Sequence, residues 1–521
     1  MNKETPLSSI FPACRRVLGS DFPDNGAVAP VDFPSLLSES SAIMERYPHI
    51  KDLAEIEWVR HTMKEAADFR DAVEEACVNP TLQLLEVEWR HLPDFFKQES
   101  PSPVAGEDLI LVWKEAETGN LHCESASHHD LLALKIVTEK LDPKRAAAAG
   151  NVSIGTIDDI LYNATHKGLL LSPPSRIRRP DDFHRGDVAD NQFFSSPVFT
   201  LQWHITQKCD LHCKHCYDRS ERRTLGRDRA LRILDDLYDF CRLHHVYGQI
   251  SFTGGNPLLY PHFNEVYREA AERGFLTAIL GNPMPRHRIE ELLDIQKPEF
   301  YQVSLEGLRE HTDYIRGRGH FDRVLTFLEL LRELKIYSMV MLTLTRANMD
   351  QVIELAEFLK ERVDLFTFNR LSMVGEGAAL ASAPVEEFPR FLEKYLQMAE
   401  HNPAAALKDN FFNIFHLKNR KPFFGGCAGF GCGAAFNFVS LLPDGRVDAC
   451  RKFPSPIGNI FEKSLNAIYH GEKAAQYRRG SIGCSDCRIR PVCGGCLAVT
   501  HGFGLDELQV RDPYCFIDRL L

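Results

Sequence analysis

Long apolar runs, internal repeats and low-complexity segments are missing from this 521-residue sequence. A helix that crosses a bilayer needs about 20 consecutive apolar residues, and no segment of the chain supplies them. The opening residues, MNKETPLSSIFPACRRVLG, also lack the extended apolar core of a secretory signal peptide. We therefore expect a cytoplasmic protein with no membrane partner.

An excess of basic residues is missing as well. Lysine and arginine number 61 against 72 aspartate and glutamate residues, and the net charge is -11. Proteins that bind nucleic acids rely on clustered lysine and arginine, so this balance argues against a nucleic-acid partner. A composition that is 44% hydrophobic and 26% charged suits a soluble globular enzyme.

Cysteine, in contrast, is plentiful, and eleven of the fifteen cysteines fall into two spaced sets. The first set is Cys209, Cys213 and Cys216 in KCDLHCKHCY. Thiolates are soft ligands that select iron-sulfur clusters or zinc. Three of them can hold three irons of a 4Fe-4S cluster and leave the fourth iron open. For these three cysteines alone, a zinc-binding or disordered thiol loop remains the alternative.

The remaining cysteines have no paired spacing and are expected to be small buried hydrophobes: Cys14, Cys77, Cys123 and Cys241. Thiols that act as cluster ligands need a reducing compartment, which also favours the cytoplasm.

The cysteine loop follows a strand-like run at 197–206 and precedes an amphipathic helical stretch at 228–246. Further β-branched and aromatic runs alternate with helical segments up to residue 402. There are six such strand-helix units in about 205 residues. They predict an α/β fold in which a parallel sheet wraps into a partial (βα)6 barrel. Reactive groups in such barrels gather at the carboxyl ends of the strands, where the cysteine loop lies.

The cysteine loop resembles the signature of the radical S-adenosylmethionine (SAM) superfamily, in which SAM completes the cluster. Two further segments carry the resemblance. After the second strand, GGNP at 254–257 stands where the superfamily usually has Gly-Gly-Glu-Pro, and after the fourth, SLEG at 304–307 precedes HTDYIRG. The resemblance implies these SAM-binding residues: His215, Gly254, Gly255, Asn256, Ser304 and Arg316.

Two of these segments have simpler interpretations. Gly-Gly-Asn-Pro is also ordinary turn chemistry, and Arg316 alone could be a solvated loop cation. Asn256 departs from the superfamily's glutamate. Its amide oxygen can accept a hydrogen bond from the SAM ammonium, but without the assistance of a negative charge.

The second cysteine set follows the barrel and has eight members, enough for two complete clusters: Cys427, Cys432, Cys450, Cys484, Cys487, Cys493, Cys496 and Cys515. Their spacing, with Gly445, resembles the SPASM domain, which carries two auxiliary 4Fe-4S clusters on many radical SAM peptide maturases. The resemblance implies one cluster on Cys427, Cys432, Cys450 and Cys496. It implies another on Cys484, Cys487, Cys493 and Cys515. Zinc ribbons are the alternative.

Two features depart from the resembling families. The SPASM pattern has three residues between its last close pair of cysteines. In this chain the corresponding cysteines, Cys493 and Cys496, are separated by only two residues. Sulfatase-maturing relatives carry an acidic base directly after the position of Cys450, where this chain has Arg451. The catalytic base is therefore unidentified.

The first 196 residues lie outside the barrel and change pattern near residue 80. We expect a helical region at 1–79 and, at 80–175, strands followed by helices that resemble the winged-helix, PqqD-like element that captures leader peptides. A DNA-binding winged helix or a structural cap is the alternative. A polar, proline-containing linker is expected at 176–196, the radical SAM barrel at 197–402 and the SPASM domain at 403–521.

Together these resemblances imply a radical SAM enzyme with three 4Fe-4S clusters and SAM. It would use a 5'-deoxyadenosyl radical to modify a ribosomally synthesised precursor peptide, forming a thioether, carbon-carbon or ring linkage, with flavodoxin or ferredoxin as electron donor. The early FPACRRVLG is reminiscent of selenobiotic-type maturases. The alternatives are a maturase that acts on a folded protein partner and an iron-sulfur redox sensor that binds DNA.

Overall fold

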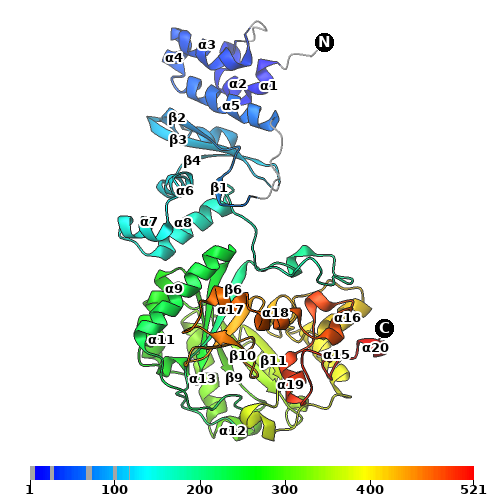
Figure 1. Cartoon of the computed structure of the whole chain (residues 1–521). Coiled ribbons are helices and arrows are strands. Elements are labelled where there is room, and N and C mark those ends of the chain that lie inside the picture. The colour runs from blue at the N-terminus through cyan, green and yellow to red at the C-terminus, as the bar shows by residue number, and fades with distance from the viewer. Residues whose placement is uncertain (1–5, 24–27, 66–72, 98–101, 117, 521) are drawn as a thin grey trace. The chain divides into compact units, whose positions relative to one another are not determined.

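The computed structural model describes residues 6–520 except 24–27, 66–72, 98–101 and 117. The chain divides into two compact units, unit 1 at residues 1–174 and unit 2 at residues 175–521 (Figure 1). No helix in the described part of the chain combines the length and the apolar character that crossing a membrane requires.

Unit 1 contains two groups of helices and a three-stranded antiparallel sheet in the order β2-β3-β4. The first helices are α1 (Leu7–Ile10), α2 (Pro12–Leu18), α3 (Phe33–Glu39), α4 (Ser41–Arg46) and α5 (Ile50–Glu65). The strands are β2 (Gln83–Arg90), β3 (Val104–Lys114) and β4 (Leu121–Ser125). The last helices are α6 (His128–Thr138), α7 (Pro143–Gly150) and α8 (Ile154–His166). Two short strands, β1 (Cys77–Val78) and β5 (Leu170–Leu171), pair antiparallel. The predicted change from helices to strands near residue 80 is present.

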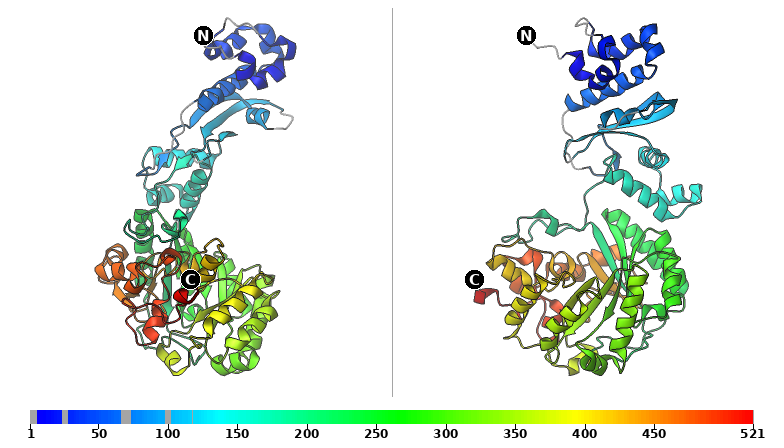
Figure 2. Two further views of the ribbon diagram at one scale, coloured as in Figure 1. Left: turned by 90° about the vertical axis from the view of Figure 1, so that its right-hand side faces the viewer. Right: turned by 180° about the vertical axis from the view of Figure 1, so that it is seen from behind.

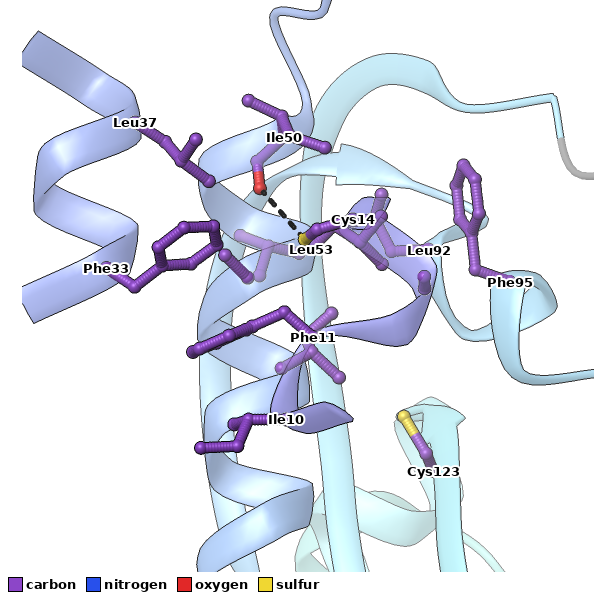
Figure 3. Close-up of a cluster of buried hydrophobic side chains, with 14 of the residues drawn as sticks. Ile10, Phe11, Cys14, Phe33, Leu37, Ile50, Leu53, Leu92, Phe95 and Cys123 are labelled. Carbon is purple, nitrogen blue, oxygen red and sulfur yellow. Dashed lines mark hydrogen bonds between the residues drawn. The ribbon is translucent and has the colours of Figure 1, made fainter. Parts of the chain in front are cut away.

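The sheet of unit 1 is covered on both faces. Successive side chains of a strand point to opposite faces, and those of β3 belong to two different hydrophobic clusters. Ile110 and Val112 of β3 belong to the hydrophobic cluster formed with the first helices. Figure 3 shows this cluster, including Phe11 and the Cys14 thiol directed at the Ile50 carbonyl. Leu111 and Trp113 belong instead to the cluster formed with α6 and α8. An additional peptide could therefore join this sheet only at an edge.

Three of the four unpaired cysteines are buried as expected, namely Cys14, Cys123 and Cys241, whereas Cys77 on β1 is half-buried.

Unit 2 contains the predicted parallel sheet of six strands, which neighbour one another in chain order. They are β6 (Val198–Thr206), β7 (Tyr247–Gly254), β8 (Leu276–Leu280), β9 (Phe300–Ser304), β10 (Ser338–Leu344) and β11 (Leu365–Arg370). The helices between them are α9 (Arg227–His244), α10 (Phe263–Glu272), α11 (Arg286–Leu293), α12 (Arg309–Arg316), α13 (His320–Glu333) and α14 (Val352–Leu359). Figure 2 shows these helices along one side of the strands.

The barrel sheet continues into the carboxyl-terminal region, so the two predicted domains share one sheet. Strand β12 (Phe438–Leu441) pairs parallel with β6, and β13 (Arg446–Asp448) and β14 (Pro456–Asn459) extend it antiparallel. The remaining helices are α15 (Phe388–Ala399), α16 (Phe412–Lys418), α17 (Leu465–Tyr469), α18 (Glu472–Arg479), α19 (Leu497–Gly502) and α20 (Ile517–Leu520). The described strands run in one linear order from β11 to β14, so the barrel is open.

Residues 176–196, expected as a linker, pack instead as part of unit 2. Arg179 is buried, and its guanidinium donates hydrogen bonds to the backbone carbonyls of Arg478 (2.6 Å), Phe430 (3.0 Å) and Cys432 (2.9 Å). It also lies 3.9 Å from the Phe436 ring centroid. The polar, proline-containing composition predicted a linker. It could not reveal the packing of Arg179, because the carbonyl partners of that residue lie 251 to 299 residues away in the chain.

Replacing Arg179 with methionine should destabilise unit 2, because three backbone carbonyls would lose their donor. We expect Arg179→Met to lower the free energy of unfolding by about 3 kcal/mol, measured by urea denaturation. The control is Arg178→Met, since Arg178 is exposed and its side chain makes no hydrogen bond in the described structure. Equal stability of the two variants would contradict the anchoring role.

Candidate functional site

A cavity of about 290 Å³ lies at the carboxyl ends of the barrel strands in unit 2. Its wall contains all three cysteines of the first set. Five of the six residues that the superfamily resemblance implies for SAM also line it: His215, Gly254, Gly255, Ser304 and Arg316. Asn256 is fully buried and does not reach the wall.

Gly254 and Gly255 hold the start of the cysteine loop against the end of β7. The N–H of Gly255 donates to the Thr206 carbonyl (2.8 Å), and the N–H of Asn256 donates to the Lys208 carbonyl (2.7 Å). A Cβ atom on Gly254 would lie 2.2 Å from the Thr206 oxygen, and one on Gly255 would lie 2.1 Å from the Lys208 oxygen. Only glycine permits this close approach.

Glu306, buried at the start of the loop after β9, orients two residues of the cavity wall. Its carboxylate accepts hydrogen bonds from Arg316 Nε (2.8 Å) and Nη2 (2.6 Å), and from the Thr343 N–H (2.8 Å). His215 Nε2 lies 3.0 Å from the same carboxylate. Burial alone would raise the pKa of Glu306, but His215 and Arg316 outweigh it and hold that pKa far below its usual value. Arg316 Nη1 approaches the Cys213 sulfur at 3.7 Å.

An acid does lie beside the glycine turn, but it comes from the cysteine loop. Asp210 Oδ1 accepts hydrogen bonds from the side-chain amides of Asn256 (3.1 Å) and Asn282 (2.7 Å). Its Oδ2 pairs with Arg323 at 3.2 Å. Asn282 also approaches the Cys209 sulfur at 3.5 Å. Because the Asn256 amide nitrogen faces Asp210, its Oδ1 points away, and that buried oxygen has no hydrogen-bond partner in the described structure.

The eight cysteines of the second set line two further cavities of unit 2. Cys427, Cys432, Cys450 and Cys496 share one of them. Cys484, Cys487, Cys493 and Cys515 share the other. These are the two groups of four that the SPASM resemblance implies. In the first group Lys408 Nζ lies 3.2 Å from the Cys427 sulfur. Burial would raise the pKa of that thiol, but Lys408 and Lys452 hold it below its usual value.

The first cysteine set and both groups of four in the second set suit iron-sulfur clusters by their chemistry, since each surrounds a cavity with sulfur donors. Nowhere in the described ranges do three His, Cys, Asp or Glu side chains converge on a point where one metal ion could bind. A 4Fe-4S cluster holds each thiolate on a different iron and so spaces its ligands more widely than a single ion does.

A buried ionic network, which the sequence pattern does not reveal, links these cavities. Arg370, at the end of β11, lines both the first cavity and the one with Cys427. Its guanidinium pairs with Asp409 (2.7 Å) and Asp512 (2.8 Å). Asp512 also accepts the N–H of Cys496 (2.8 Å) and lines the third cavity. The partners of Arg370 come from distant parts of the chain, so spacing could not predict them.

The contact between Asp210 and Asn256 can be tested by introducing the glutamate that the superfamily usually has. We expect Asn256→Glu to lower the free energy of unfolding by about 3 kcal/mol, because it buries a second carboxylate beside Asp210. Adding Asp210→Asn should restore most of this loss. A double-mutant cycle by chemical denaturation measures the coupling. Additive effects would show that the two side chains do not interact.

Comparison with known families agrees with this geometry. Residues 203–359 match the profile of the radical SAM superfamily, and residues 432–496 match that of SPASM, an iron-sulfur cluster-binding domain.

Three characterised relatives are similar to this chain. AdoMet-dependent heme synthase of Methanosarcina barkeri is 24% identical, over 60% of this chain and 95% of the relative. The subtilosin biosynthesis protein AlbA of Bacillus subtilis is 25% identical, over 60% of this chain and 70% of the relative. Mycofactocin maturase MftC of Mycolicibacterium smegmatis is 28% identical, over 65% of this chain and 86% of the relative.

Among solved structures, SuiB of Streptococcus suis bound to its precursor peptide SuiA matches with a TM-score of 0.50 and 18% identity. The match covers 78% of this chain and 96% of SuiB, and at this identity it shows a shared fold. The two domain matches and the three thiol-lined cavities lead to one conclusion: the chain is a radical SAM enzyme with a SPASM iron-sulfur domain.

Proposed function

We propose that this enzyme modifies a ribosomally synthesised precursor peptide. The observation that carries the proposal is the extent of the SuiB match. The match covers 78% of this chain, whereas unit 2 makes up only about two-thirds of the chain. The aligned region therefore includes part of unit 1. SuiB binds a precursor peptide, and the relatives AlbA and MftC are named for bacteriocin biosynthesis and mycofactocin maturation.

In this proposal the first cavity holds a 4Fe-4S cluster on Cys209, Cys213 and Cys216, with SAM against the Gly254-Gly255 turn. When bound there, the cluster and SAM would supply 5'-deoxyadenosyl radical chemistry for modification of the peptide. The chain itself contributes binding and orientation. Arg316 is held by Glu306, with its Nη1 3.7 Å from the Cys213 sulfur, and we assign its guanidinium to the SAM carboxylate. The cavity wall encloses the reacting groups.

The two groups of four cysteines are proposed as ligands of two auxiliary 4Fe-4S clusters. Each group has four thiols, so neither cluster would offer an open iron to the substrate. We assign them to electron transfer, with flavodoxin or ferredoxin as the external donor. Thioether, carbon-carbon and ring linkages all fit this chemistry.

Unit 1 is proposed as the element that captures the leader of the precursor peptide, by adding it as a strand to the sheet. Both faces of the sheet are covered, so an edge must serve. Among the described residues, no strand pairs with the outer edge of β2. The N–H of Glu88, at the register irregularity of β2, donates to Asp52 (2.7 Å), and we propose that the N–H groups of Glu86 and Leu84, two and four positions earlier, lie along the same edge. Leu84 is 48% exposed.

Strand addition predicts that removing one outward N–H will weaken leader binding. Glu86→Pro should reduce the affinity for the precursor peptide about tenfold or more, because a paired strand cannot form past a proline. Isothermal titration calorimetry can measure this with a short peptide encoded beside the gene. Ser125→Pro on β4 is the matched change at the opposite edge.

If Ser125→Pro alone weakens binding, the leader adds to β4 instead. If neither proline has an effect, strand addition fails and an enzyme that acts on a folded partner becomes the better proposal.

The cluster assignment predicts separate losses of iron and activity. Cys213→Ala should abolish release of 5'-deoxyadenosine from SAM after dithionite reduction, since two thiolates cannot hold the first cluster. Iron content should fall from about twelve to about eight atoms per chain. Cys241→Ala, which removes a buried thiol outside all three sets, should retain both. Stoichiometric zinc in the reconstituted wild-type enzyme would contradict the auxiliary clusters.

A second candidate function comes from the heme synthase relatives. The Methanosarcina barkeri enzyme aligns over 95% of its own length but only 60% of this chain, less than unit 2 alone contains. AlbA and MftC align over similar shares of this chain, so it is the SuiB match, which extends into unit 1, that leads us to favour the peptide substrate.

A further inference from the structure

The wall of the first cavity carries more positive than negative charge. Its charged residues are Asp218, Arg219, Arg316, Arg370, Arg451 and Lys452. Most of the cations already have partners. Arg316 pairs with Glu306 and Arg370 with two buried aspartates. Arg219 donates to the Cys213 carbonyl (2.8 Å). Each of these guanidinium groups is already committed to at least one partner in the protein.

Arg451 and Lys452 are not committed in this way. They follow Cys450 directly, and in the described part of the chain neither side chain forms a hydrogen bond or an ion pair. Asp218 does not neutralise them. Its carboxylate receives the Ser220 N–H (3.0 Å) and the amide of Gln207 (3.2 Å), and it pairs with Arg222 (3.4 Å).

Tyr217 also has its own partner at this cavity. Tyr217 lines the cavity, and its hydroxyl lies 3.0 Å from His204 Nε2. Arg451 and Lys452 therefore line the cavity with no carboxylate partner among the described residues.

We propose that Arg451, assisted by Lys452, binds a carboxylate of the substrate in this cavity. The inference rests on the proposed peptide-modifying function and names a property of its substrate. A guanidinium fork suits a carboxylate by bidentate geometry, and enclosure strengthens a charged hydrogen bond. The carboxylate belongs to an acidic side chain or to the peptide's C-terminus. Arg451, where sulfatase-maturing relatives have a base, thus selects the substrate.

The test separates carboxylate binding from peptide binding by using a small probe first. Glutarate and its neutral diamide, glutaramide, are titrated by calorimetry into the full-length reconstituted enzyme with saturating SAM. We expect glutarate to bind about tenfold more tightly than glutaramide. Arg451→Gln should abolish this preference, and Arg451→Lys should restore part of it. Arg390→Gln, an exposed arginine outside the cavity, is the matched control and should retain it.

Three results would overturn the inference. The first is equal binding of the two probes by the wild-type enzyme, and the second is an unchanged preference in an Arg451→Gln, Lys452→Gln double variant. The third is loss of SAM affinity in Arg451→Gln to the same extent as loss of glutarate affinity, since the cation would then serve SAM.

Four acetylated pentapeptides, AAXAA with X as Glu or Gln and with a free or amidated C-terminus, then identify the source of the carboxylate. A preference for Glu assigns the side chain, and a preference for the free terminus assigns the C-terminal group. If glutarate binds through Arg451 but no peptide does, the carboxylate site stands and the peptide substrate is wrong. The two proposals can therefore fail separately.

Discussion

The first cavity depends on one buried carboxylate. Glu306 lies at 1% exposure and joins three segments that are separate in the chain: the cysteine loop through His215, helix α12 through Arg316, and strand β10 through the Thr343 N–H. A buried charge is tolerated only when it is paired and hydrogen-bonded, and Glu306 meets both conditions. Its partners are thereby fixed beside Cys213, so the geometry of the cavity wall follows from satisfying this one group.

The glycine turn makes the complementary contribution on the other side of the cysteine loop. Gly254 and Gly255 let the loop approach β7 more closely than any side chain would allow. Asp210 then ties the loop to Asn256 and Asn282 at the ends of two neighbouring strands. The loop is therefore held by a carboxylate network on each side, while its three thiols remain in the cavity wall.

Several features of the fold were predictable because they depend on local pattern. The alternation of strands and helices after residue 197 gives the six parallel strands in chain order. Spacing alone separates Cys209, Cys213 and Cys216 from the later set. The interleaved division of the later set, which joins Cys496 to Cys427, was inferred from resemblance, and the structure brings the same cysteines together. The packing of residues 176–196 was missed because local composition does not reveal distant partners.

The sequence by itself determined the set of three thiols on one loop, the parallel sheet that carries it and the presence of eight further thiols after the barrel. These follow from residue type and spacing, which act over a few positions. Only the tertiary structure decided that Asp210 is the acid beside Asn256 and that Arg370 links the cavities. It also decided that Arg451 faces a cavity without a partner among the described residues. Charge pairing acts through space between remote segments, so it is settled only when the chain has folded.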